Sequence, residues 1–191
     1  MPELPEVESS RRLLESHCKG KRISSVVALE AGGGARDGAF DDIVLGEGIS
    51  EEGLSAALIR RAVVAVRRRG KQLWLELDGS GPHLLMHFGM TGAIVIEGVG
   101  ATTYKSFKVS GSFPPRFSKL QLGFDGGLRL ALADPRRLAR VLLREDLWDR
   151  RRFLRSPPTP FVNPPASTPS HQLSAPSAPP SRPFCSIRPA W

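Results

Sequence analysis

Apolar residues recur with a helical period near the start of the chain. Val7, Leu14 and Cys18 fall on one stripe of a helix, with polar residues between them. Gly20 follows the last of these positions and is typical of a helix end. The pattern therefore predicts a first helix over residues 7–19.

Further along, the period shortens to two, which is the period of a β-strand. Ser50 is the expected N-cap of a second helix that runs to Arg61. In Leu73–Leu77 the leucines alternate with Trp74 and Glu76, as in a strand with one face in the core. Other strands are expected at 21–30, 63–67, 84–87, 93–97, 119–124, 128–133 and 139–143, with a hairpin turn at 125–127 and a long loop over 98–115. Many short strands and two helices predict a mainly β fold, a β-sandwich with flanking helices.

The composition changes after about residue 155. Residues 156–191 hold most of the chain's 17 prolines and only two charged residues, Arg182 and Arg188. Such a segment cannot bury enough apolar surface to form a core. We therefore expect one domain over residues 1–150 and a Pro/Ser-rich disordered tail over 151–191.

Charge and cysteine content narrow the function classes. The 191 residues carry a net charge of +8 and a pI near 10.3, which favours a polyanion partner, nucleic acid before a membrane surface. No apolar run approaches the roughly 20 residues of a membrane span, and the N-terminus lacks the apolar stretch of a secretory signal. Two cysteines, Cys18 and Cys185, cannot form a four-ligand zinc site and imply no disulfide framework.

The first residues combine groups that suit Schiff-base chemistry. If Met1 is removed, Pro2 carries a secondary amine with a pKa of roughly 7.7–8.0, which can attack an aldehyde. Glu3 places a carboxyl group directly beside that amine. The alternative is a plain helix start, since Pro5 suits the first helical turn and Glu6 suits the positive end of the helix dipole.

Two central segments carry candidate nucleic-acid contacts. The basic run Arg67–Lys71 is either a set of phosphate contacts or a solvated charge run. His87 is a candidate hydrogen-bond donor to a phosphate. A metal site formed by His83 and His87 is disfavoured because the segment is a predicted strand. Met90 lies on a predicted tight turn, where its side chain either wedges between bases or folds back on the core.

A third segment, Asp134–Leu138, places two arginines just after a predicted strand. Arg136 could enter the base stack or clamp phosphates. Asp134 could orient one of the arginines through a charge-assisted pair. The alternative is a structural salt bridge.

Four ordered segments together carry a family resemblance: PELPEVES at 2–9, RRRGKQLWLEL at 67–77, HFGMTGAI at 87–94 and DPRRLAR at 134–140. They resemble the N-terminal catalytic domain of the formamidopyrimidine-DNA glycosylases (Fpg or MutM, with the Nei enzymes as relatives). The resemblance covers about residues 1–147 and is closest to the plant and fungal branch. It implies a two-sheet β-sandwich with two helices.

The resemblance also implies an activity and a setting. The activity is base-excision repair by a DNA glycosylase and AP lyase, which removes 8-oxoguanine and formamidopyrimidines and cleaves the strand at the abasic site. The implied partner is damaged double-stranded DNA, bound by a monomer. No cofactor is expected, since the zinc-finger ligands of the bacterial relatives are absent. The nucleus is the expected location in a eukaryote, and the cytoplasm or nucleoid otherwise.

The catalytic roles are carried over by position. Pro2 matches the nucleophile that attacks the sugar C1′, and Glu3 matches the general acid/base that protonates the sugar ring oxygen. Glu6 matches a second active-site carboxylate. Lys71 matches the lysine that holds phosphates beside the lesion, and His87 resembles a further phosphate contact.

The DNA-binding roles follow in the same way. Met90 matches the residue that fills the gap left by the flipped base. Arg136 matches the arginine that faces the orphaned partner base, and Arg137 beside it is counted among the DNA contacts. Leu138 stands where bacterial members carry a phenylalanine wedge.

The resemblance ends where the family continues into a helical domain that supplies half of the DNA-binding cleft. Here the chain turns to Arg150–Arg152 and the proline-rich segment. Three hypotheses follow: a glycosylase/AP lyase weakened by truncation; a catalytically inactive truncated form that binds DNA weakly or has no function; and an unrelated basic β-domain.

Overall fold

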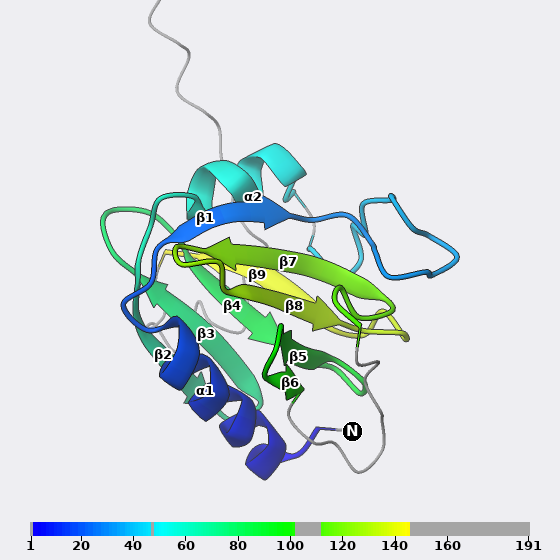
Figure 1. The fold of residues 1–191 in the computed structure, drawn as a ribbon, viewed down its shortest axis with the longest axis horizontal. Coiled ribbons are helices and arrows are strands. Elements are labelled where there is room, and N and C mark those ends of the chain that lie inside the picture. The colour runs from blue at the N-terminus through cyan, green and yellow to red at the C-terminus, as the bar shows by residue number, and fades with distance from the viewer. Residues whose placement is uncertain (1, 47, 102–111, 146–191) are drawn as a thin grey trace, which may run out of the picture. The chain divides into compact units, whose positions relative to one another are not determined.

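The computed structural model describes residues 2–46, 48–101 and 112–145. Within them lie two helices and nine strands, as the mainly β prediction requires (Figure 1). In chain order they are α1 (Leu4–Cys18), β1 (Ile23–Val27), α2 (Glu51–Leu58), β2 (Val63–Arg69), β3 (Gln72–Leu77), β4 (His83–His87), β5 (Ala93–Ile96), β6 (Gly100–Ala101), β7 (Ser118–Phe124), β8 (Arg129–Ala133) and β9 (Arg140–Arg144).

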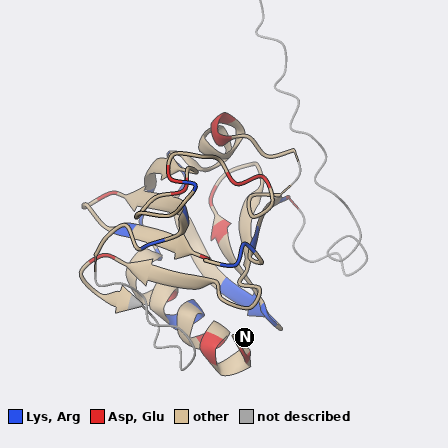
Figure 2. Cartoon of the chain, turned by 90° about the vertical axis from the view of Figure 1, so that its right-hand side faces the viewer, with Lys and Arg blue, Asp and Glu red and all other residues tan. Residues whose placement is uncertain are grey.

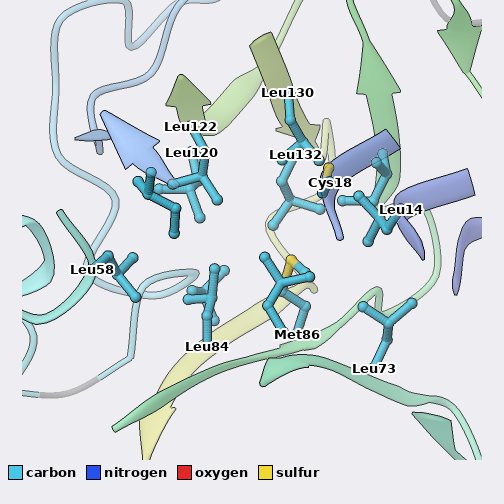
Figure 3. Close-up of a cluster of buried hydrophobic side chains, with 14 of the residues drawn as sticks. Leu14, Cys18, Leu58, Leu73, Leu84, Met86, Leu120, Leu122, Leu130 and Leu132 are labelled. Atoms are coloured by element: carbon cyan, nitrogen blue, oxygen red, sulfur yellow. The ribbon is translucent and has the colours of Figure 1, made fainter. Parts of the chain in front are cut away.

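The strands form two antiparallel sheets that share one core. The order is β1-β7-β8-β5-β6 in the five-stranded sheet and β2-β3-β4-β9 in the four-stranded sheet. Leu84 and Met86 of β4 lie in the same buried cluster as Leu120 and Leu132 of the other sheet (Figure 3). The predicted two-sheet sandwich is therefore confirmed.

Helix α1 begins three residues earlier than the periodicity predicted. Glu3 is extended at the N-cap, and its backbone N–H donates to the carboxylate of Glu6 at 2.7 Å. Pro5 lies in the first turn, where no intrahelical N–H bond is needed. These local bonds start the helix at Leu4, ahead of Val7, its first fully buried residue.

Other boundaries also differ from the prediction. Ser50 is the N-cap of α2 and accepts from the Gly53 N–H at 3.0 Å, as expected, but the helix ends at Leu58 because Arg60 has a positive φ of 69°. The predicted loop over 98–115 contains the short strand β6, which pairs with β5. The middle of that loop, the predicted boundary at residue 150 and the predicted tail lie outside the described residues.

The alternation in β3 is confirmed, with one addition. Leu73, Leu75 and Leu77 lie in the common core. Trp74 faces the other way, yet it is also buried and packs with Leu85 and the partly buried Leu142 in a second cluster. The four-stranded sheet thus has an inner face in the core and an outer face that carries Trp74.

Candidate nucleic-acid interface and N-terminal reactive group

A row of polar side chains crosses one end of the four-stranded sheet. The strand register places Arg69 opposite Gln72, Gln72 opposite His87, and His87 opposite Arg140. Directly opposite residues project from the same face of an antiparallel sheet, and alternation assigns these four to the outer face with Trp74. We call Arg69, Gln72, His87 and Arg140 the polar row. Lys71 precedes Gln72 in the β2–β3 turn and so lies next to the row. The two predicted phosphate contacts, Lys71 and His87, are therefore at the same end of the sheet.

His87 is set up as a neutral hydrogen-bond donor. Its Nδ1 accepts the backbone N–H of Gly89 at 3.2 Å, which leaves the proton of a neutral ring on Nε2. Burial lowers the pKa of His87 below its ordinary value, and the positive charges of Lys71 and Arg140 lower it further. The ring therefore stays uncharged at neutral pH.

His83 and His87 do not form a metal pair. Both belong to β4, and four residues of strand separate them by about 13 Å. The ring of His83 instead accepts the backbone N–H of Leu77 at 3.1 Å. Among the residues that the structure describes, no cluster of three or more His, Cys, Asp or Glu side chains could hold a metal ion.

The basic run before β3 divides into paired and unpaired members. Arg67 forms an ion pair with Glu76, and Arg68 binds Glu8 of α1 at 2.9 Å. Within the described part of the chain, no carboxylate forms an ion pair with Arg69 or Lys71. Arg67 and Arg68 are therefore held by carboxylates of the protein, an outcome that neither alternative described, whereas Arg69 and Lys71 stay candidates for phosphate contact.

The start of α1 is docked on the strand that leads to this row. Glu8 binds Arg68, and Arg11 donates to the carbonyl oxygen of Val66 at 3.3 Å. Hydrogen bonds from Arg11, and then from Arg68, lower the pKa of Glu8 to about 2. Figure 2 shows acidic positions at the start of α1 and a basic segment beside the N-terminus in that view.

The N-terminal residues ahead of α1 carry the predicted reactive groups. Pro2 is buried, whereas Glu3 is exposed. The carboxylate of Glu6 accepts the Glu3 N–H, and the Glu6 carbonyl accepts the Ser10 hydroxyl at 3.0 Å. The helix start and the candidate Schiff-base segment are therefore the same few residues.

Two loops beyond the polar row pack directly on each other. Gly89 has a φ of +58°, and a Cβ at that position would lie 2.4 Å from the carbonyl oxygen of Leu138. Met90 and Leu138 project from this contact with 42% and 40% of their surface exposed. Met90 is therefore not buried in the core, and an exposed apolar side chain lies in each of the two loops.

Asp134 joins these loops from a fully buried position. One carboxylate oxygen accepts the Thr91 hydroxyl and the Arg136 N–H at 3.1 Å. The other accepts the N–H groups of Leu138 at 2.7 Å and Ala139 at 2.6 Å. The expected pairing of Asp134 with an arginine side chain is wrong, because backbone donors and Thr91 use its oxygens.

The two arginines of this loop have different surroundings. Arg137 has a positive φ of 56° and donates through Nε and Nη2 to Asp41 at 2.8 and 2.9 Å. Arg136 is exposed, and its side chain forms no ion pair within the described residues. Asp41 lies 96 residues from Arg137 in the sequence, so no local sequence pattern predicts this ion pair.

Asp41 belongs to a buried charge cluster beneath the loop. Lys119 approaches Asp41 at 3.1 Å and also pairs with the buried Glu30. Burial alone would raise the pKa of Asp41, but hydrogen bonds from Arg137 and Lys119 outweigh it and lower the pKa to about 2. The charged carboxylate thus anchors Arg137, while its neighbours Arg136 and Leu138 face solvent.

Comparison with known proteins places these features in a family context. The model described as "Formamidopyrimidine-DNA glycosylase N-terminal domain" matches residues 1–141. A formamidopyrimidine-DNA glycosylase of Arabidopsis thaliana is 41% identical over 145 residues, which cover 75% of this chain and 34% of the relative. One of Halorhodospira halophila is 33% identical over 162 residues, which cover 84% of this chain and 51% of the relative. The chain thus spans between a third and about half of these relatives.

Solved structures show the same fold. Lactococcus lactis Fpg (MutM), in complex with DNA that contains N7-benzyl-Fapy-dG, matches with a TM-score of 0.53 and 28% identity over 74% of this chain and 43% of that protein. MutM in complex with DNA that contains carbocyclic 8-oxo-G matches with a TM-score of 0.55 and 26% identity over 75% of this chain and 44% of that protein. Within the described residues, no helix is long and apolar enough to cross a membrane.

Proposed function

This chain belongs to the formamidopyrimidine-DNA glycosylase family, and we propose that, once Met1 is removed, it acts on damaged DNA as a glycosylase and AP lyase. The observation that carries the proposal is the docking of α1, with Pro2 and Glu3 at its start, on β2 next to the polar row. A terminal amine and phosphate-binding side chains are the two requirements of Schiff-base chemistry on a DNA sugar.

The proposed reaction begins with the nitrogen of Pro2. While Met1 is attached, this nitrogen is an amide and cannot attack; once Met1 is removed, it is a secondary amine. The amine forms a bond to C1′ of the damaged nucleotide and gives up its N–H proton, and the bond from C1′ to the oxidised purine breaks as the base leaves with that proton. Glu3 donates a proton to the sugar ring oxygen, so the ring opens to an iminium. The Glu3 carboxylate then accepts a proton from C2′, and the elimination expels the 3′ phosphate, which cleaves the strand.

The remaining site residues are proposed to hold the DNA. Lys71 and His87 bind phosphates beside the lesion. Met90 and Leu138, which are both exposed on loops that meet at Gly89, fill the gap left by the flipped base and separate its neighbours. Arg136 faces the partner base. Arg137 is proposed as the anchor of this loop, because Asp41 engages its guanidinium.

Borohydride trapping tests this proposal. The full chain without Met1 is incubated with abasic-site duplex DNA and borohydride at low salt, and any covalent adduct is digested and mapped by mass spectrometry. We expect one adduct, on Pro2. The absence of an adduct at high protein concentration would favour the inactive form that only binds DNA. Excision of 8-oxoguanine from a duplex then tests the proposed substrate class. We further propose that the protein needs no metal, acts as a monomer and, in a eukaryote, works in the nucleus.

A further inference from the structure

We propose that the polar row is a track for the phosphates of one DNA strand, in which Arg69, Gln72 and Arg140 bind the backbone alongside Lys71 and His87. This inference rests on the proposed function and extends it from two phosphate contacts to a continuous surface. The proposed binding of the DNA backbone does not depend on base sequence and is separate from the chemistry at Pro2.

The length of the row suits a strand of DNA. The row crosses four adjacent strands in the order β2-β3-β4-β9. Three gaps of about 4.8 Å span about 14 Å. Because a strand also winds around the axis, its consecutive phosphates lie about twice as far apart as the 3.4 Å axial rise for each nucleotide. The row is therefore long enough to follow about three consecutive phosphates.

Each member of the row can donate hydrogen bonds toward a phosphate. His87 presents Nε2, because its Nδ1 accepts the Gly89 N–H. Arg140 donates through Nη1 to the carbonyl oxygens of Arg137 at 3.3 Å and Ala139 at 2.8 Å. These bonds hold its guanidinium at the sheet end, and its Nε and Nη2 have no acceptor among the described residues. Gln72, which lies between Arg69 and His87 in the row, adds amide donors without charge.

No carboxylate among the described residues neutralises the positive charge of the row. Arg67, one row further along the outer face, is paired with Glu76. Arg129 on the other sheet is held by Glu97. In contrast, Arg69 and Arg140 form no ion pair within the described part of the chain. Two positive arginines, together with Lys71, therefore remain for an anionic ligand, and evenly spaced anions are the defining feature of a nucleic-acid strand.

The test uses the full chain and an undamaged fluorescent duplex, with binding measured by anisotropy over a series of salt concentrations. Arg69→Gln and Arg140→Gln are each expected to lower the slope of log K against log salt by about 0.9 and to weaken binding about fivefold near 0.1 M salt. Arg129→Gln removes the same charge from the paired arginine of the other sheet and is expected to change affinity less than about twofold. Gln72→Lys adds a charge to the row and is expected to raise the slope by about 0.9.

Several results would overturn the inference. One is a wild-type chain that does not bind duplex DNA even at low salt. Another is a pair of row variants that behave like Arg129→Gln, or a Gln72→Lys variant with normal melting and an unchanged slope. Undamaged DNA requires no Schiff base, so a failed trapping experiment at Pro2 leaves this test intact, and an unchanged salt slope leaves the trapping result intact.

Discussion

The N-terminal segment 2–6 and the loop 134–140 present the residues proposed to meet DNA, but they are held in different ways. The segment depends on a bond between neighbours, from the Glu3 N–H to Glu6, three residues apart. The loop depends on partners far along the chain: Asp134 binds Thr91 across 43 residues, and Arg137 binds Asp41 across 96. The reactive group thus follows from local sequence, whereas the geometry of the loop needs the completed fold.

The largest expected effect comes from the nitrogen of Pro2. Insertion of an alanine between Met1 and Pro2 keeps this nitrogen in a peptide bond and moves the free amine about 3.8 Å away. Trapping of abasic DNA should fall at least about 100-fold, because a displacement of about 1 Å can already cost that factor. Pro2→Gly, which keeps an amine at the position, should fall less, and Pro5→Ala should trap normally. Equal trapping by the extended chain would remove Pro2 from the mechanism.

Removal of the Asp134 carboxylate should destabilise the protein most among the loop changes. Asp134→Ala leaves three backbone N–H groups and the Thr91 hydroxyl without their acceptor. Each unsatisfied buried donor costs about 1–3 kcal/mol, so with partial relaxation we expect a loss of about 3–5 kcal/mol. Urea denaturation measures this loss. A loss below about 1 kcal/mol would show that the loop does not depend on Asp134.

Contact between the two loops can be tested at Gly89. A Cβ there would require both a positive φ and space that the Leu138 backbone occupies. Gly127 has a φ of +79° but nothing within 4 Å of its Cβ position, so it is a matched control. We expect Gly127→Ala to cost about 1 kcal/mol and Gly89→Ala about 3 kcal/mol in the free energy of unfolding. Equal costs would mean that the loops do not constrain each other.

These contacts show which features the sequence could predict. The leucine alternation of β3 and the N-cap at Ser50 depend on residues close together in the chain, and both were predicted correctly. The periodicity placed the start of α1 at Val7, because the first turn has no buried residue, but the helix start indicated by Pro5 and Glu6 was predicted correctly. The anchoring of Arg137 was missed because Asp41 approaches it only after the sheets have formed.

The polar row lies between these two cases. His87, Lys71 and, within the basic run, Arg69 were candidate phosphate contacts from the sequence, whereas Gln72 and Arg140 gained a role only from the register of four strands. Alternation within a strand is local, but which residues lie opposite one another is not. Members of this surface can therefore be identified from local sequence, but its extent depends on the strand register.

Acid should weaken both regions, through different carboxylates. The pKa of Glu8, which supports α1, and of Asp41, which supports the loop, is lowered to about 2 in the folded protein. A lowered pKa stabilises the fold above the ordinary value, near 4, and this stabilisation is lost as the pH falls toward 2. We expect protonation of Asp41 to lower the free energy of unfolding by about 2 kcal/mol, and protonation of the more exposed Glu8 to lower it by about 1 kcal/mol. Denaturation of Asp41→Asn and Glu8→Gln between pH 6 and pH 2 measures each share. If a variant's free energy of unfolding changes with pH as steeply as that of the wild type, the carboxylate that it lacks does not contribute to the acid sensitivity.

The smallest effect on stability is expected from substitutions of Glu6. These substitutions distinguish a positioning role of Glu6 from a role as a second active-site carboxylate. Glu6→Gln keeps an oxygen that can accept the Glu3 N–H, whereas Glu6→Ala removes the acceptor. If Glu6 only positions the N-terminal segment, Glu6→Ala should cost about 1 kcal/mol or less and lower the trapping rate up to about tenfold, while Glu6→Gln stays within about twofold of the wild type. A second active-site carboxylate needs its charge, so it would make both variants equally slow. We expect the first result, because the Glu6 carboxylate already has a structural partner in the segment that carries Pro2.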